Sequence, residues 1–133
     1  MSKELNKMQF MPNTFIIENL QGILDSIELI EIRFTGITQS DNFVMNADGV
    51  MVLDSICMRL QVIGELLKKI DKINSAIWER YPQIEWPNII KLRDIISHHY
   101  TQVDHEIIYD ICQNNLPDLK KVVQQIIGDH AAH

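Results

Sequence analysis

The sequence predicts an all-α protein, folded as an antiparallel bundle of five or six helices. Long stretches repeat apolar residues at three- and four-residue spacing, which is typical of amphipathic helices. No stretch alternates apolar and polar residues as a strand would, and the connections between the periodic stretches are short. The 133 residues, 46% of them hydrophobic and 23% charged, are enough for one domain with its own core.

The first half of the chain contains two long amphipathic stretches. We expect residues 1–12 to form a flexible leader ending at Pro12, residues 13–128 the bundle, and residues 129–133 a tail. The first long helix begins at the capping side chains of Asn13 and Thr14 and ends near Gly36. Its apolar stripe comprises Ile16, Ile17, Leu20, Ile23, Leu24, Ile27, Ile30 and Phe34. A polar connection then leads to a short helical turn at residues 43–45.

The second long helix is expected from residues 46–48 to about Asp71. Its apolar stripe comprises Val50, Leu53, Ile56, Cys57, Leu60, Ile63, Gly64, Leu67 and Ile70. Glycine inside a helix costs about 0.5–1 kcal/mol relative to alanine, so we expect another helix to approach closely at Gly64. A short helix over residues 73–80 stops before Pro82, because the residue that precedes a proline avoids the α region.

The last third of the chain predicts three more helices. Pro87 is suited to the first position of a helix, where its missing N–H costs nothing, and this helix carries the sequence NIIKLRDIISHHY. Two further helices are expected over residues 103–114 and 116–127, with Gly128 as the stop signal.

Composition restricts the possible functions. The net charge of −6 argues against a broad basic face that coats nucleic acid, but it leaves room for a small site that binds one or two phosphates. No signal peptide and no apolar run of about 18 residues is visible, so we expect a cytoplasmic protein that does not enter membranes. Cys57 and Cys112 lie in apolar stretches without C-x-x-C spacing, which predicts buried free thiols.

The helix after Pro87 places several polar groups on one side. At about 100° per residue, one apolar arc faces the core and comprises Ile89, Leu92, Ile95, Ile96 and His99. Arg93, Asp94, Ser97 and His98 lie on the opposite side, and Tyr100 lies at the edge between the two. Asp94 is four residues before His98, so its carboxylate could orient the imidazole. By spacing alone, however, such residues are typical of a solvated helix face.

Four segments in order resemble the HepT family of HEPN proteins, over residues 13–127. They are LQVIGELLKK (60–69), ERYPQIEW (79–86), LRDIISHHY (92–100) and VDHEIIYDICQNNLPDLKK (103–121). The family motif is an arginine and a polar residue, three further residues, and then His-x-Tyr. It matches Arg93, Asp94, His98 and Tyr100, and together with the other segments it is far more specific than the motif alone.

The resemblance implies an HEPN bundle that acts as a metal-independent endoribonuclease without a cofactor, the toxin of a type VII-like toxin–antitoxin system. In this family the site lies in a cleft between the protomers of a homodimer. His98 would take the 2′-hydroxyl proton or protonate the leaving 5′-oxygen, since imidazole populates both protonation states near neutrality. Arg93 would stabilise charge on the scissile phosphate, and Asp94 would orient His98 or Arg93. The substrate would be RNA, such as tRNA or mRNA.

The resemblance also implies a protein partner, an antitoxin nucleotidyltransferase of the MntA type that transfers AMP to Tyr100. The added charge and bulk beside Arg93 would block RNA. Tyr100 could also anchor the bundle through a hydrogen bond, and both roles can coexist. The best candidates for guiding RNA are Lys68, Lys69, Lys72 and Lys91, although solvated lysines are common on helices.

Two other interpretations remain. His98, His99 and His105 could bind a metal ion, but the first two point to different sides of a helix and no H-E-x-x-H pattern supports them. More seriously, the chain could be a non-catalytic HEPN interaction module that partners a nucleotidyltransferase and binds nucleotide or substrate. RNA cleavage in the presence of EDTA distinguishes the enzyme from the module.

Overall fold

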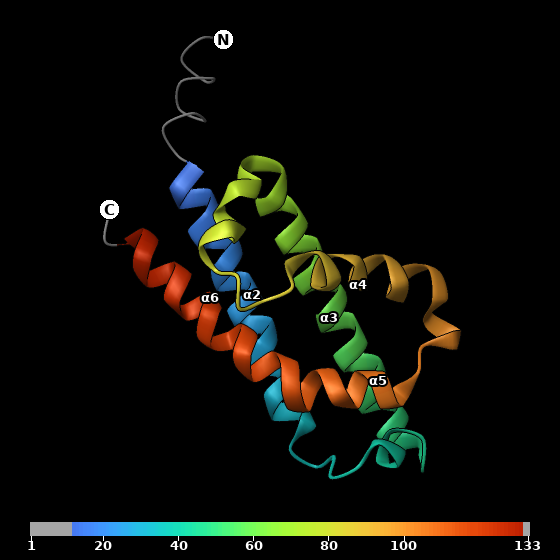
Figure 1. Ribbon diagram of the computed structural model, residues 1–133. Coiled ribbons are helices and arrows are strands. Elements are labelled where there is room, and N and C mark those ends of the chain that lie inside the picture. The colour runs from blue at the N-terminus through green and yellow to red at the C-terminus, as the bar shows by residue number, and fades with distance from the viewer. Residues whose placement is uncertain (1–11, 132–133) are drawn as a thin grey trace.

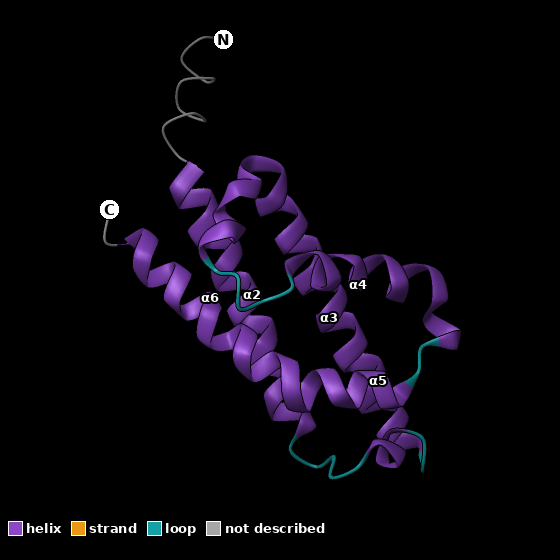
Figure 2. Cartoon of the chain, viewed as in Figure 1, coloured by secondary structure: helices purple, strands orange, loops and turns teal. Residues whose placement is uncertain are grey.

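A computed structural model describes residues 12–131 of the chain, except for the side chains of Pro12, His99 and Tyr100. The predicted leader before Pro12 and the last two residues lie outside the described residues. All regular elements in residues 12–131 are helical, which confirms the all-α prediction (Figure 2). None of these helices has the length and apolar character needed to cross a membrane.

Five α-helices, joined by short 3-10 and π segments, make up the described chain. In order they are α2 (Pro12–Phe34), η1 (Ser40–Phe43), α3 (Ala47–Asn74), η2 (Ser75–Arg80), α4 (Trp86–His99), η3 (Tyr100–Gln102), α5 (His105–Asp110), η4 (Ile111–Asn115) and α6 (Leu116–Ala131). Helix α2 packs against both α3 and α6 and runs antiparallel to them, while α4 packs on α3 and extends away from the other long helices (Figure 1).

The predicted helix boundaries in the first half of the chain are largely confirmed. Helix α2 begins at Pro12 itself, a position that proline tolerates well, and ends two residues before Gly36. Helix α3 begins directly after Asn46, whose side chain accepts a hydrogen bond of 2.8 Å from the backbone N–H of Gly49. The short helix expected at residues 73–80 is the 3-10 helix η2, and it ends before Pro82.

The C-terminal helices differ from the prediction. Helices α5 and α6 are joined without a loop by the π-helical η4, and the chain bends between them (Figure 1). Pro117, at the start of α6, has no N–H for the regular helical hydrogen bond. The predicted stop at Gly128 is wrong: α6 continues to Ala131, because no glycine among the described residues adopts the positive φ that ends a helix.

The core lies between α2, α3 and α6, with η2 and α4 closing one side. Most residues of the predicted stripes are buried, but Val50, expected in the α3 stripe, is exposed. Trp78 stacks on Trp86 with ring centroids 4.3 Å apart, and the indole of Trp86 donates a 2.9 Å hydrogen bond to the carbonyl of Tyr81. These contacts attach the first turn of α4 to η2 and so fix where α4 starts.

Both cysteines are buried free thiols, as predicted. Burial, with a smaller contribution from Asp54, raises the pKa of Cys57 to about 11. Burial, together with the nearby Cys57, raises the pKa of Cys112 to about 12. Both thiols are therefore protonated at neutral pH and act as small apolar side chains.

Candidate active site

The site begins at the contact between α3 and α4. A Cβ atom built on Gly64 would lie 2.7 Å from the Cβ of Arg93 and 3.2 Å from its backbone nitrogen. No larger residue fits there without moving one of the helices, so the predicted close approach at Gly64 is confirmed. The approaching residue is Arg93 itself, the arginine of the candidate motif.

Two carboxylates hold the guanidinium of Arg93. Its Nη1 donates to Oδ1 of Asp94 at 3.0 Å, and its Nη2 donates to Oε1 of Glu65 on α3 at 3.4 Å. The Arg93 side chain is 32% exposed, and its Nε is buried with no hydrogen-bond partner among the described residues. Arg93 is therefore half-buried against α3, and not on the water side of α4 as its spacing predicted.

Helix α4 is rotated about its axis relative to the prediction. Ile96 is buried at 2% exposure, but Ile95, expected to face the core, is 50% exposed. After the first turn of α4, its exposed side chains among those described are Lys91, Asp94, Ile95, Ser97 and His98. Gly64 explains the rotation, because its missing side chain lets the Arg93 side of α4 dock on α3.

His98 lies near the outer end of α4, where its side chain is exposed and forms no hydrogen bond or ion pair with another described residue. Asp94 contacts Arg93 and not His98. The helix ends one residue after His98, and the 3-10 turn η3 begins at Tyr100. The side chains of His99 and Tyr100 lie outside the described residues, so their predicted roles stay predictions.

The proposed metal ligands are not gathered in the described part of the chain. His105 lies on α5, with its Nε2 3.6 Å from Oδ1 of Asp41. Among the described side chains, no group of three or more His, Cys, Asp or Glu residues could hold a metal ion. Of the four lysines proposed to guide RNA, Lys69, Lys72 and Lys91 are exposed and Lys68 is half-buried.

The model of a family described as "Ribonuclease HepT-like" matches residues 23–126, which include both helices of the Arg93 contact. This chain belongs to the HepT-like family. Its relatives include "Putative RNase MJ0127" of Methanocaldococcus jannaschii, which is 34% identical over 116 residues, 86% of this chain and 83% of that protein. "Putative RNase TTE0752" of Caldanaerobacter subterraneus is 29% identical over 108 residues, 81% of this chain and 90% of that protein. "Probable ribonuclease HepT" of Thermococcus cleftensis is 28% identical over 101 residues, 76% of this chain and 86% of that protein. No solved structure gives a significant match.

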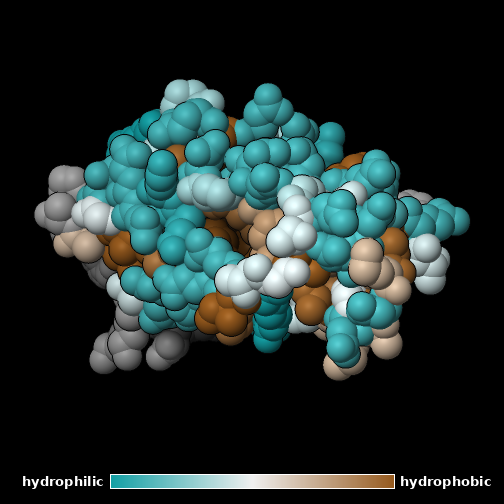
Figure 3. Space-filling model, turned by 90° about the horizontal axis from the view of Figure 1, so that it is seen from below, coloured by the Kyte–Doolittle hydropathy of each residue, from teal (hydrophilic) through white to brown (hydrophobic). Residues whose placement is uncertain are grey.

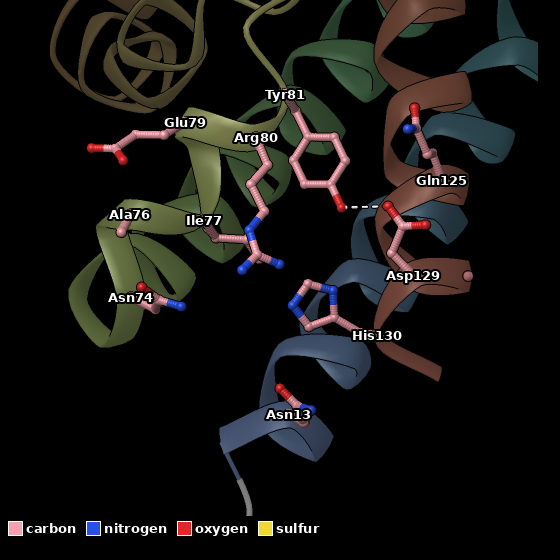
Figure 4. A pocket seen from close by; sticks show the side chains of 11 residues that line it. Asn13, Asn74, Ala76, Ile77, Glu79, Arg80, Tyr81, Gln125, Asp129 and His130 are labelled. Carbon is pink, nitrogen blue, oxygen red and sulfur yellow. Dashed lines mark hydrogen bonds between the residues drawn. The ribbon is translucent and has the colours of Figure 1, made fainter. Parts of the chain in front are cut away.

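This HepT-like chain also has a hollow of about 920 Å³, at the end of the bundle where α2 begins and α6 ends (Figure 4). It is lined by η2 and the last turns of α6, and Arg93, Asp94 and His98 are not among its described lining residues. Tyr81 donates a 2.6 Å hydrogen bond to Asp129 across it (Figure 4). Burial and this hydrogen bond raise the pKa of Tyr81 to about 12. The contact ties η2 to α6.

Sequence reasoning missed one residue of the site, Glu65. A pattern that could have found it was present, because Glu65 directly follows the glycine at which a close approach was predicted. The sequence did not show that the residue approaching Gly64 and Glu65 from the neighbouring helix is Arg93.

Proposed function

We propose that this HepT-like chain is an endoribonuclease that cleaves RNA without a metal ion, through Arg93 and His98. The observation that carries the proposal is that a guanidinium held in place by two carboxylates lies on the same helix as an exposed imidazole. The relatives named as ribonucleases support RNA as the substrate.

The two groups suit the two requirements of phosphodiester cleavage. The imidazole of His98 takes the proton of the 2′-hydroxyl as its oxygen attacks phosphorus, or returns a proton to the 5′-oxygen as that bond breaks. Arg93 donates hydrogen bonds to the phosphate oxygens, on which negative charge accumulates in the transition state. Asp94, which accepts a hydrogen bond from Arg93, orients the guanidinium.

We further propose that the complete site lies between two copies of the chain. Residues five apart on a helix are separated by about 140° and about 7.5 Å, so Arg93 and His98 of one copy diverge. Ile95, an apolar residue that is 50% exposed, lies on the same face as His98 and favours a partner surface that covers it. Its exposure supports a homodimer in which the Arg93 and His98 groups of both copies converge.

Purified protein incubated with total RNA in EDTA tests the nuclease. We expect cleavage by the wild type and none by His98→Ala, with the helical far-UV signal unchanged because His98 is exposed. Arg93→Ala tests the guanidinium. Because Arg93 is half-buried, the helical signal of this variant is compared with that of the wild type before its cleavage is interpreted. If the wild type leaves RNA intact at every concentration yet binds a nucleotidyltransferase stably, the chain is an interaction module instead.

The dimer has a separate test. Ile95→Asp places a charge in the proposed interface, so sedimentation should show a monomer, and cleavage should fall because each site loses its second half. Ile73→Asp, at an isoleucine of α3 that is 48% exposed, is the control, and it tests whether any added charge has this effect. A wild type that sediments as a monomer at concentrations where it cleaves RNA would refute the shared site.

We also propose that the enzyme is the cytoplasmic toxin of a toxin–antitoxin pair, silenced when a nucleotidyltransferase transfers AMP to Tyr100. The net charge of −6 favours a selective substrate such as folded tRNA over bulk RNA. Tyr100→Phe should still cleave RNA but remain active after exposure to the partner and ATP. AMP found on that variant by mass spectrometry would exclude Tyr100 as the acceptor.

A further inference from the structure

We propose that Glu65 is a positioning residue, which holds the Arg93 guanidinium at a fixed place on the bundle so that its free N–H groups face the RNA phosphate. This inference rests on the proposed nuclease function and names a residue outside the R-x-x-x-x-H-x-Y motif.

The first argument is the origin of the two carboxylates. Asp94 follows Arg93 on α4, so the bond between them orients the guanidinium only relative to its own helix. Glu65 belongs to α3, 28 residues earlier in the chain, and its 3.4 Å contact with Nη2 crosses the helix interface. Glu65 therefore fixes the guanidinium relative to the bundle.

The second argument is the contact next to it. Gly64 brings the backbone of α3 close to Arg93, since a Cβ there would lie only 2.7 Å from the arginine Cβ. The next residue along α3 then has its carboxylate within reach of the guanidinium, although that side chain is 50% exposed. Gly64 and Glu65 together set the depth and the direction of the Arg93 side chain.

The third argument is the number of donors that remain. Arginine has five N–H groups, one on Nε and two on each Nη. The Nε is buried, while Asp94 and Glu65 each accept from one of the two Nη atoms. One N–H on each Nη is left to donate to the oxygens of a phosphate.

Removing Glu65 distinguishes a positioning residue from an ordinary surface acid, because the two roles predict opposite changes in the rate of RNA cleavage. A surface carboxylate near an RNA site repels phosphates, so its loss should strengthen RNA binding and leave cleavage equal or faster. Without a positioning carboxylate, the guanidinium is no longer held in one orientation. The rate of cleavage then falls even though the affinity for RNA improves. Misplacement of a catalytic group by about 1 Å can cost about 100-fold in rate.

The kinetic experiment compares Glu65→Ala and Glu65→Gln with the wild type at saturating enzyme on one RNA. Both variants lose the same charge, but the glutamine amide oxygen can still accept from Nη2. We expect the maximal rate to fall about 10- to 100-fold in Glu65→Ala, with partial recovery in Glu65→Gln and RNA affinity unchanged or tighter in both. Glu79→Ala, which removes an exposed acid of η2, is the control and should cleave like the wild type.

A second measurement needs no RNA and no nuclease activity. In ¹⁵N NMR spectra, the guanidinium N–H signals of Arg93, assigned by their loss in Arg93→Lys, should show restricted rotation in the wild type. Averaged signals in Glu65→Ala, with the backbone spectrum otherwise intact, support the positioning role. Cleavage by Glu65→Ala at the wild-type rate, or unchanged Arg93 signals, overturns it. If His98→Ala also cleaves normally, the nuclease proposal fails separately.

Discussion

Replacing Gly64 with alanine tests the contact on which the site is built. The new methyl carbon would lie 2.7 Å from the Cβ of Arg93 and 3.2 Å from its backbone nitrogen. Carbon atoms in ordinary contact are about 3.5–4.0 Å apart, so α3 and α4 must separate locally by about 1 Å. Neither atom of Arg93 is the far end of a flexible side chain, so rotamer changes alone cannot relieve the clash.

Two opposing free-energy contributions determine how much Gly64→Ala changes the stability of the protein. Overpacking a close contact costs about 1–3 kcal/mol, whereas alanine gains about 0.5–1 kcal/mol over glycine in a helix. Gly128 provides the matched control, because it also lies in a helix and nothing is within 4 Å of a Cβ built there. The gain from placing alanine in a helix is common to both substitutions. The free energies of unfolding of the two variants should therefore differ by the overpacking cost, about 1–3 kcal/mol.

Urea unfolding followed by far-UV circular dichroism measures both variants. We expect Gly128→Ala to be more stable than the wild type and Gly64→Ala less stable, with equal slopes against urea. Gly64→Ala should also cleave RNA more slowly, because the displaced α4 carries both Arg93 and His98. If the two alanine variants stabilise the protein equally, the close approach of α3 and α4 is refuted.

Three further predictions concern the rest of the bundle. Asn46→Ala removes the cap of α3 and should cost about 1 kcal/mol in urea unfolding, and an unchanged midpoint would contradict the capping role. Tyr81→Phe removes the hydrogen bond to Asp129 and should cost about 1–2 kcal/mol at neutral pH, against a Tyr109→Phe control that loses only an exposed bond. Because the pKa of Tyr81 is raised from 10.0 to about 12, this stabilisation is complete below pH 10 and disappears as the pH rises toward 12. A wild type that loses no more stability than Tyr81→Phe over that range would contradict the assignment. Cys57 and Cys112, with pKa values of about 11 and about 12, should react with a thiol reagent at pH 8 at least about 100-fold more slowly in the folded than in the urea-unfolded protein. Equal rates in the two states would show that the thiols are accessible.

Arg93 illustrates which features of the site the sequence predicts and which it does not. The motif identified the residue, and the glycine in the α3 stripe indicated a close helix contact. Helical periodicity placed Arg93 on the water side and Ile95 in the core, and the structure reverses this: Arg93 is 32% exposed and Ile95 50% exposed. Periodicity gives the relative angles of side chains around a helix but not the direction in which the helix docks.

The sequence by itself determined the helical class, the core stripes of α2 and α3, the start of α3 at Asn46 and the buried thiols. These follow from spacing and capping, which involve residues at most a few turns apart along the chain. Only the tertiary structure decided the rotation of α4, the continuous passage from α5 to α6, and the pairing of Arg93 with Glu65 across 28 residues. The physical reason is that these features depend on which surfaces meet, and at Gly64 a single missing side chain determines that.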